Sequence, residues 1–170
     1  MSASDRTLLL MRHAKSEYPD GVADHERPLA PRGIREAALA GDWIRANTAG
    51  VDTVLCSTAT RTRQTLARTG LDVEDADVHY ADDLYDTTPG TVIRLVNAIA
   101  DGVATLLVVG HEPTMSVLAL GLAGDQSDPA VADAISAKFP TSAIAVLRIS
   151  QPWGKLEPRS ATLVDFHVAR

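Results

Sequence analysis

The chain has 170 residues, of which 45% are hydrophobic and 22% are charged, and its formal net charge is −6. This composition is typical of a soluble globular protein and excludes an intrinsically disordered one. The excess of acidic residues argues against a dedicated nucleic-acid or anionic-membrane binder, because such proteins present a basic face. A chain of this length can bury one hydrophobic core, so we expect a single domain over residues 1–170.

Nothing in the sequence predicts export or membrane insertion. The first residues lack the basic and then apolar profile of a signal peptide, and every apolar stretch is far shorter than the roughly 20 residues of a membrane span. The single cysteine, Cys56, excludes an internal disulfide and fits a reducing compartment. We therefore expect a cytoplasmic monomer without a membrane partner.

Apolar runs and helical periodicity alternate along the first half of the chain. A strand is expected over residues 7–12, followed by a polar loop and then a helix over residues 33–47. A short strand over residues 52–56 precedes Ser57, which is a suitable N-cap for a helix over residues 59–68. A third strand is expected over residues 78–80, and a helix over residues 89–100 begins at a proline.

The second half continues the alternation. The most apolar strand covers residues 104–109, and a turn leads from it into a helix over residues 114–122. Two strands, over residues 143–149 and 161–168, end the chain. Strands that alternate with helices predict an α/β fold, a three-layer α/β/α sandwich with a mostly parallel central sheet and helices on both faces.

Basic and imidazole side chains follow three of the expected strands. Arg12 and His13 end the first strand, Arg61 follows the second, and His111 follows the strand over residues 104–109. Because ligands of an open α/β sheet bind beyond the carboxyl ends of its strands, we expect these side chains to meet at one edge. Such a cluster of cations repels itself unless an anion neutralises it, and the arginine fork matches phosphate oxygens. The sequence therefore predicts a phosphate site in which a neutral imidazole can act as a nucleophile.

The same segments resemble the histidine phosphatase superfamily, the phosphoglycerate-mutase-like group, and within it the short SixA-type phosphohistidine phosphatases. They stand in that family's order and span almost the whole chain. The resemblance rests on Leu10-Met-Arg-His-Ala-Lys-Ser16, Asp24-His-Glu-Arg-Pro-Leu29 with Arg32-Gly33, Ser57 to Arg61 with Gln64-Thr65, Val109-Gly-His-Glu-Pro113 and Lys138-Phe-Pro-Thr141.

This resemblance implies a phosphatase whose nucleophile, His13, becomes transiently phosphorylated. It also implies that Arg12 and Arg61 bind the phosphoryl oxygens, and that a protonated His111 completes the site. The family usually carries Ser or Thr at the position of Ala30, so the helix that follows lacks a side-chain cap, at a cost of about 1 kcal/mol.

Asp86 falls near the position of the family's acidic proton donor, which is commonly a glutamate, so the donor is either Asp86 or solvent. Expelling an alkoxide requires a positioned acid, worth about 10²–10⁴-fold in rate, whereas the nitrogen of phosphohistidine is readily protonated. This difference favours phosphohistidine in a protein as the substrate. Lys15 and Ser16 are either substrate contacts or ordinary loop residues.

Two other functions stay open: a small-molecule phosphatase acting on sugar or nucleotide phosphates, and a non-catalytic module that binds phosphorylated ligands. Cysteine-dependent phosphatase chemistry is excluded, because four residues separate Cys56 from Arg61 where that chemistry needs five. We find no zinc-ligand spacing, P-loop or dinucleotide-binding motif, so we expect no metal and no organic cofactor. The expected partner is a phosphorylated protein or a small phosphorylated substrate, and not a nucleic acid.

Overall fold

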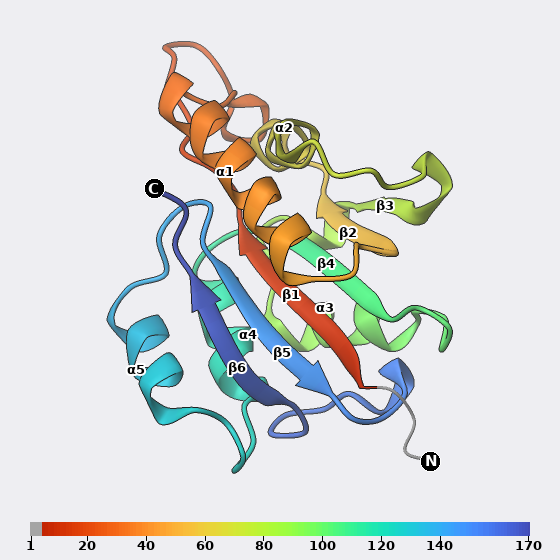
Figure 1. The fold of residues 1–170 in the computed structure, drawn as a ribbon. Helices are drawn as coiled ribbons and strands as arrows, with labels where there is room; N and C mark the ends of the chain where they lie inside the picture. Colours follow the sequence, from red (N-terminus) through yellow and green to blue (C-terminus); the bar gives the residue numbers. More distant parts are fainter. Residues whose placement is uncertain (1–4) are drawn as a thin grey trace.

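The computed structural model describes residues 5–170. Its strands form one six-stranded sheet in the order β3-β2-β4-β1-β5-β6 (Figure 1). These strands are β1 (Arg6–Arg12), β2 (Thr53–Ser57), β3 (Val78–Ala81), β4 (Thr105–Gly110), β5 (Ile144–Ile149) and β6 (Thr162–His167). The pairs β1–β4, β2–β4 and β2–β3 are parallel, whereas β5 is antiparallel to both β1 and β6. The predicted mostly parallel sheet is confirmed.

Helices cover both faces of this sheet. They are α1 (Pro31–Asn47), α2 (Thr60–Thr69), α3 (Pro89–Asn97), α4 (Thr114–Leu122) and α5 (Pro129–Ala137), with short 3₁₀ turns at η1 (Asp24–Glu26), η2 (Asp75–Asp77), η3 (Asp82–Leu84) and η4 (Trp153–Lys155). Figure 1 shows α1 and α2 in front of the sheet and α3, α4 and α5 behind it. The predicted three-layer sandwich is confirmed.

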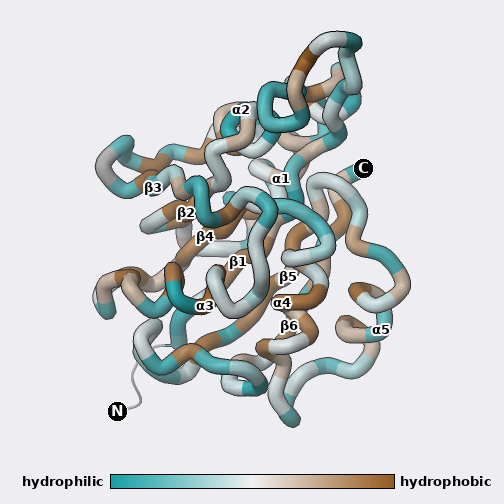
Figure 2. The backbone as a smooth tube through the Cα atoms, turned by 180° about the vertical axis from the view of Figure 1, so that it is seen from behind, coloured by the Kyte–Doolittle hydropathy of each residue, from teal (hydrophilic) through white to brown (hydrophobic). Residues whose placement is uncertain are grey.

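The core divides along the same two faces. In β1, Leu8 and Leu10 pack with the helices behind the sheet, while Leu9 and Met11 pack with α1 in front. All four side chains are fully buried, which explains why β1 is a continuous apolar run rather than an alternating one. Figure 2 shows the hydrophobic parts of the backbone concentrated on the central strands.

Some predicted boundaries are wrong. Helix α1 begins at residue 31 rather than 33, and α3 ends at residue 97 rather than 100. Ser57 is not a helix cap: it is the last residue of β2, and Ala59 occupies the N-cap position of α2. Helix α5 was not predicted, although Asp128, whose side chain accepts a hydrogen bond from the Ala130 N–H, stands directly before a proline and signals a helix start.

Two glycines allow α1 to lie close to neighbouring backbone. A Cβ atom at Gly33 would lie 2.1 Å from the carbonyl oxygen of Lys15, and one at Gly41 would lie 1.9 Å from that of Thr69. Only glycine fits at such distances. Gly33 thereby allows the start of α1 to lie against the loop that follows β1, at a residue two positions after His13.

Candidate active site

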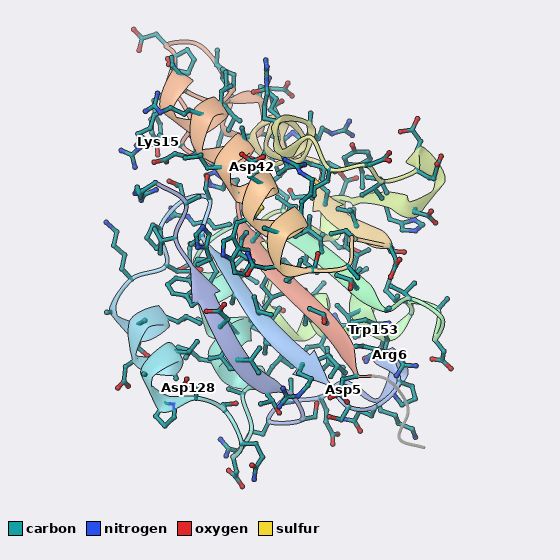
Figure 3. The ribbon with its side chains drawn as sticks, in the orientation of Figure 1. Asp5, Arg6, Lys15, Asp42, Asp128 and Trp153 are labelled. Atoms are coloured by element: carbon teal, nitrogen blue, oxygen red, sulfur yellow. The ribbon has the colours of Figure 1, made fainter. Side chains whose placement is uncertain are left out.

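A cavity of about 210 Å³ lies where β1 and β4 end. It is lined by six of the seven residues predicted from the sequence, namely Arg12, His13, Lys15, Ser16, Arg61 and His111. Figure 3 labels Lys15 near the carboxyl end of β1, and Asp5 and Arg6 at the opposite end. The fold therefore brings together side chains that are up to 99 residues apart in the sequence, between positions 12 and 111.

His13 is held as a neutral imidazole. Its Nδ1 lies 2.7 Å from the carbonyl oxygen of Ala14, and because a carbonyl can only accept, Nδ1 carries the proton. Burial, together with the smaller effect of the nearby charges of His111, Arg61 and Arg12, lowers the pKa of His13 to about 3. At neutral pH the lone pair of Nε2 is therefore available for nucleophilic attack.

His111 stands beside His13, with ring centroids 5.3 Å apart. Its Nε2 shares a hydrogen bond of 2.8 Å with the hydroxyl of Ser57, which fixes the ring. Burial and then the charge of Arg61 lower the pKa of His111 to about 4. The prediction that His111 is protonated is therefore wrong for the free protein, because the buried ring faces cations and is neutral at pH 7.

Three buried nitrogen atoms around this cavity have no hydrogen-bond partner within residues 5–170: Nε of Arg12, Nε of Arg61 and Nδ1 of His111. The arginine nitrogens can only donate. Buried polar groups are almost always paired, so unpaired ones call for an explanation. Oxygen atoms of a phosphoryl group are suitable acceptors for these donors.

Arg61 is held by the loop before α1. Its Nη1 donates to the carbonyl oxygen of Asp24 at 2.7 Å, and its Nη2 donates to Asp24 Oδ2 at 3.1 Å. Asp24 also accepts from Arg27 Nε at 3.0 Å and from the hydroxyl of Tyr85. The hydrogen bond from Tyr85, followed by those from the two arginines, keeps the pKa of Asp24 well below its usual range. Asp24 therefore stays ionised and orients both guanidinium groups.

Sequence reasoning did not assign a role to Asp24, Arg27 or Tyr85. Arg27 is buried, lines the cavity and donates through Nη1 to the hydroxyl of Ser16 at 2.6 Å. The sequence did contain a signal for Asp24 and Arg27, because both belong to a segment on which the family resemblance rests. Tyr85 lies beside Asp86 in the sequence and gave no separate signal.

Asp86 lies outside the cavity that contains His13. It is exposed, has a positive φ of 52°, and lines a neighbouring cavity together with Arg61 and His111. Lys15 is exposed at the edge of the first cavity, whereas Ser16 is buried and accepts the hydrogen bond from Arg27. The structure thus brings Lys15 and Ser16 to the cavity of His13 and Asp86 only to its neighbour.

Cys56 is buried in β2, and burial raises the pKa of its thiol to about 12. Such a thiol is unreactive at neutral pH, in agreement with the exclusion of cysteine-dependent chemistry. Within residues 5–170, no three His, Cys, Asp or Glu side chains gather as a metal ion would require. No helix in the same part of the chain is both long and apolar enough to cross a membrane.

The fold and this cavity are those of a phosphatase built around histidine. Residues 8–101 match the profile of the histidine phosphatase superfamily (branch 1), and the chain belongs to this superfamily. Family membership and the structural neighbours described next support a hydrolase that removes phosphoryl groups.

Among its relatives is the phosphohistidine phosphatase SixA of Escherichia coli, which is 29% identical over 151 residues, or 85% of this chain and 86% of SixA. The uncharacterized Mycobacterium tuberculosis protein Rv1276c is 64% identical over 161 residues, which cover 94% of this chain and all of that protein. A Nakamurella multipartitia structure named after the phosphohistidine phosphatase SixA superimposes with a TM-score of 0.89, at 38% identity and 100% coverage of both chains. The protein histidine phosphatase SixA complexed with tungstate gives a TM-score of 0.78, at 25% identity, covering 96% of this chain and 97% of that one.

Proposed function

We propose that this protein is a phosphohistidine phosphatase that acts on phosphorylated histidine in proteins and uses His13 as its nucleophile. The observation that carries the proposal is the state of His13: a neutral ring with Nδ1 bound to Ala14 and Nε2 free, in one cavity with two arginines and a second histidine. The likeness to SixA, and the tungstate oxyanion bound in one SixA structure, support it.

The first chemical step follows from this geometry. Nε2 of His13 attacks phosphorus, a new P–N bond forms, and the bond to the leaving group breaks. Arg12 and Arg61 bind the phosphoryl oxygens through donors that include their unpaired Nε atoms. A phosphoryl dianion beside His111 raises the pKa of that ring, so that it becomes protonated in the complex and donates to a phosphoryl oxygen.

The second step returns the enzyme to its starting state. Water attacks the phosphorus of phospho-His13, the P–N bond breaks, and phosphate leaves. Because His13 supplies the nucleophile and the arginines supply the charge, we propose that the reaction requires no metal and no organic cofactor. Activity in the presence of a strong chelator tests this part of the proposal, and loss of activity would contradict it.

The remaining predicted residues have supporting roles in this proposal. Ser16 supports Arg27, whose guanidinium it binds, rather than the substrate. Lys15 is exposed at the edge of the cavity and attracts the anionic substrate. A leaving group that does not already carry a proton receives one from solvent or from Asp86.

The surroundings of the cavity suit a protein substrate. Between Arg61 and Leu106, the described chain consists of the rest of α2, strand β3, helix α3 and short turns, which belong to the sandwich rather than to an added lid. A phosphorylated histidine on the surface of a partner can reach such a site. Parallel assays on a phosphohistidine protein and on a panel of sugar and nucleotide phosphates test this preference, and faster hydrolysis of a metabolite would reverse it.

The nucleophile is tested by His13→Ala, with His79→Ala on the exposed part of β3 as its matched control. We expect His13→Ala to lower kcat/KM at least about 10³-fold and the control to stay within about twofold of wild type. Rapid quenching of the wild-type reaction should trap an acid-labile phosphoryl group that mass spectrometry locates at residue 13.

Normal turnover by His13→Ala, or a phosphoryl group at another residue, would falsify the assignment. Tight phosphate binding by the wild type with no phosphoenzyme during turnover would instead support the non-catalytic binding module.

A further inference from the structure

A second cavity adjoins the one that contains His13. It has a volume of about 190 Å³ and is lined by Asp24, Arg61, Tyr85, Asp86, His111 and Glu112. Three of these residues, Arg61, His111 and Glu112, also line the first cavity. The two cavities therefore meet around Arg61 and His111, so a substrate whose phosphoryl group fills the first can extend its leaving group into the second.

The two cavities carry opposite charge. Four basic side chains line the first cavity, namely Arg12, Lys15, Arg27 and Arg61, together with the single carboxylate of Glu112. The second cavity is lined by three carboxylates and by one of these arginines. An anionic group is therefore favoured in the first cavity, and a cationic group is favoured in the second.

The three carboxylates of the second cavity differ in how they are paired. Asp24 forms ion pairs with Arg61 and Arg27, so its charge is compensated. Glu112 accepts hydrogen bonds from the N–H and the hydroxyl of Ser116 at 2.6 and 2.8 Å, which are neutral donors. In the described part of the chain neither Glu112 nor Asp86 forms an ion pair. Within the described residues neither carboxylate is therefore held in an ion pair, although Glu112 interacts at longer range with the charge of Arg12.

The boundary between the cavities also holds unused hydrogen-bonding groups. Arg61 and His111 line both cavities, and their side chains belong to residues that are only 6% and 9% exposed. Nε of Arg61 and Nδ1 of His111 have no partner within residues 5–170. A phosphorylated ligand that lies across this boundary supplies an acceptor for Nε of Arg61, and for Nδ1 of His111 when that nitrogen carries a proton.

We infer that the second cavity holds the leaving group, and that Asp86 and Glu112 select leaving groups that carry positive charge when they bind. The inference rests on the proposed function and assigns its substrate preference to charge: the favoured substrates carry the phosphoryl group on the nitrogen of a basic side chain. The clearest example is phosphohistidine with a proton on its second ring nitrogen.

The carboxylates favour this protonated ring, and its reaction requires no proton donor. The lone pair of His13 Nε2 forms the new P–N bond, and the old P–N bond breaks with its electron pair going to the substrate nitrogen. The substrate ring leaves as a neutral imidazole that keeps its own proton. The positive charge passes to the ring of phospho-His13, whose Nδ1–H still donates to the carbonyl of Ala14.

A phosphate ester that bears a carboxylate is disfavoured on two counts. Its negative charge faces Asp86 and Glu112, and its oxygen leaves as an alkoxide that must be protonated. The second cavity thus favours substrates with nitrogen-linked phosphoryl groups over anionic phosphorylated metabolites.

The test compares two substrates, a phosphohistidine peptide and 3-phosphoglycerate, by the ratio of their kcat/KM values. Glu112→Gln is the decisive variant, because glutamine keeps an oxygen that accepts from the Ser116 N–H while the charge is lost. Asp86→Asn is the second variant, and Asp83→Asn is the control, since this exposed residue of the same segment lines neither cavity.

We expect Glu112→Gln to lower the ratio about fivefold to tenfold, while the control stays within about twofold of wild type. Asp86→Asn is read on the peptide alone, where kcat/KM should fall, because the ester would also slow if Asp86 protonates its alkoxide. An unchanged ratio in Glu112→Gln together with an unchanged peptide kcat/KM in Asp86→Asn would overturn this inference, even where the wild type hydrolyses the peptide through phospho-His13. A wild type that forms no phospho-His13 from the peptide would overturn the proposed function as well, so the two failures are distinguishable.

Discussion

The two ends of the sheet differ in how their polar groups are paired. At the amino end, Asp52 Oδ2 accepts hydrogen bonds from the N–H groups of Ala104 and Thr105 at 3.0 and 2.9 Å. Arg6 Nη2, at the same end, donates to the carbonyl of Asp101 at 2.9 Å. These polar side chains join the start of β4 and the turn before it to neighbouring strands, and their hydrogen bonds serve the fold.

At the carboxyl end, buried nitrogens of Arg12, Arg61 and His111 have no partner in residues 5–170. This end also holds the two histidines whose pKa values burial lowers most strongly. Groups that are buried, ionisable and unpaired lower the stability of the free protein, and they are typical of functional sites. The comparison indicates that the carboxyl end is organised for a ligand and the amino end for the fold.

If cavity size alone identified the functional site, the site would lie at the amino end of the sheet. A cavity of about 600 Å³ near the amino ends of β1 and β4 is larger than either cavity at the carboxyl end, and its lining includes Asp5, Trp43 and Thr105. Among the described residues that line it there is no arginine and no histidine. The chemistry of the lining, and not the volume, therefore identifies the site.

Among the changes that compare the two ends, the largest effect is expected from replacing one arginine at each end. Arg61→Lys keeps the charge and loses the fork that binds Asp24 and that we propose binds the phosphoryl group, so we expect kcat/KM to fall about 10²–10³-fold. Arg6→Lys should leave kcat/KM within about twofold of wild type. Steady-state kinetics on one phosphorylated substrate measures kcat/KM for both variants. Similar losses in the two variants would abolish the proposed difference between the ends.

The two buried histidines predict a pH-dependent stability that originates at the carboxyl end. The folded pKa values of His13 and His111, about 3 and about 4, lie below the ordinary value of 6.5. The unfolded chain therefore binds more protons below pH 6.5, and stability falls as the pH decreases from 6.5 toward 4. For His111 the loss at pH 4.5 is about 2 kcal/mol.

Urea unfolding at pH 7.5 and pH 4.5, for the wild type and for His111→Asn, measures this loss. The wild type should lose about 2 kcal/mol more than the variant over this interval, because the variant lacks one of the titrating rings. Carboxylates titrate alike in both proteins and cancel in the difference. Equal losses would show that His111 is not held neutral by the fold.

The smallest effect is expected for a residue that lies near the carboxyl end of the sheet without taking part in the reaction. Cys56 lies one position before Ser57, yet its side chain belongs to the core between the sheet and α1. Cys56→Ala should lower the free energy of unfolding by about 1 kcal/mol and leave kcat within about twofold of wild type. Unfolding and turnover are measured on the same preparation. A large loss of turnover would indicate that the thiol takes part in the reaction.

Much of the site could be predicted because its residues follow strands. Arg12, His13 and His111 stand directly after apolar runs, and the carboxyl ends of parallel strands meet at one edge. The contacts of Asp24 could not be predicted in this way. Asp24 lies 37 residues from Arg61 and 61 residues from Tyr85, in a loop without periodicity, so nothing in the local pattern shows that the three side chains meet.

The protonation states of the two site histidines could not be predicted from the sequence either. The prediction of a protonated His111 followed from an expected anion, while the pKa values depend on how deeply each ring is buried and on which charges surround it. Similarly, the role of Ser57 could not be predicted, because its hydroxyl pairs with a histidine 54 residues away in addition to accepting from the Ala59 N–H at the start of the next helix.

The order of apolar runs and helical stripes by itself determined the layers of the sandwich and the edge of the sheet where the basic residues gather, because periodicity and strand direction are local properties. Only the tertiary structure decided that Asp24 orients Arg61, that both histidines are neutral, and that an acidic cavity adjoins a basic one. These features depend on distances and burial between segments far apart in the chain, and no local pattern encodes them.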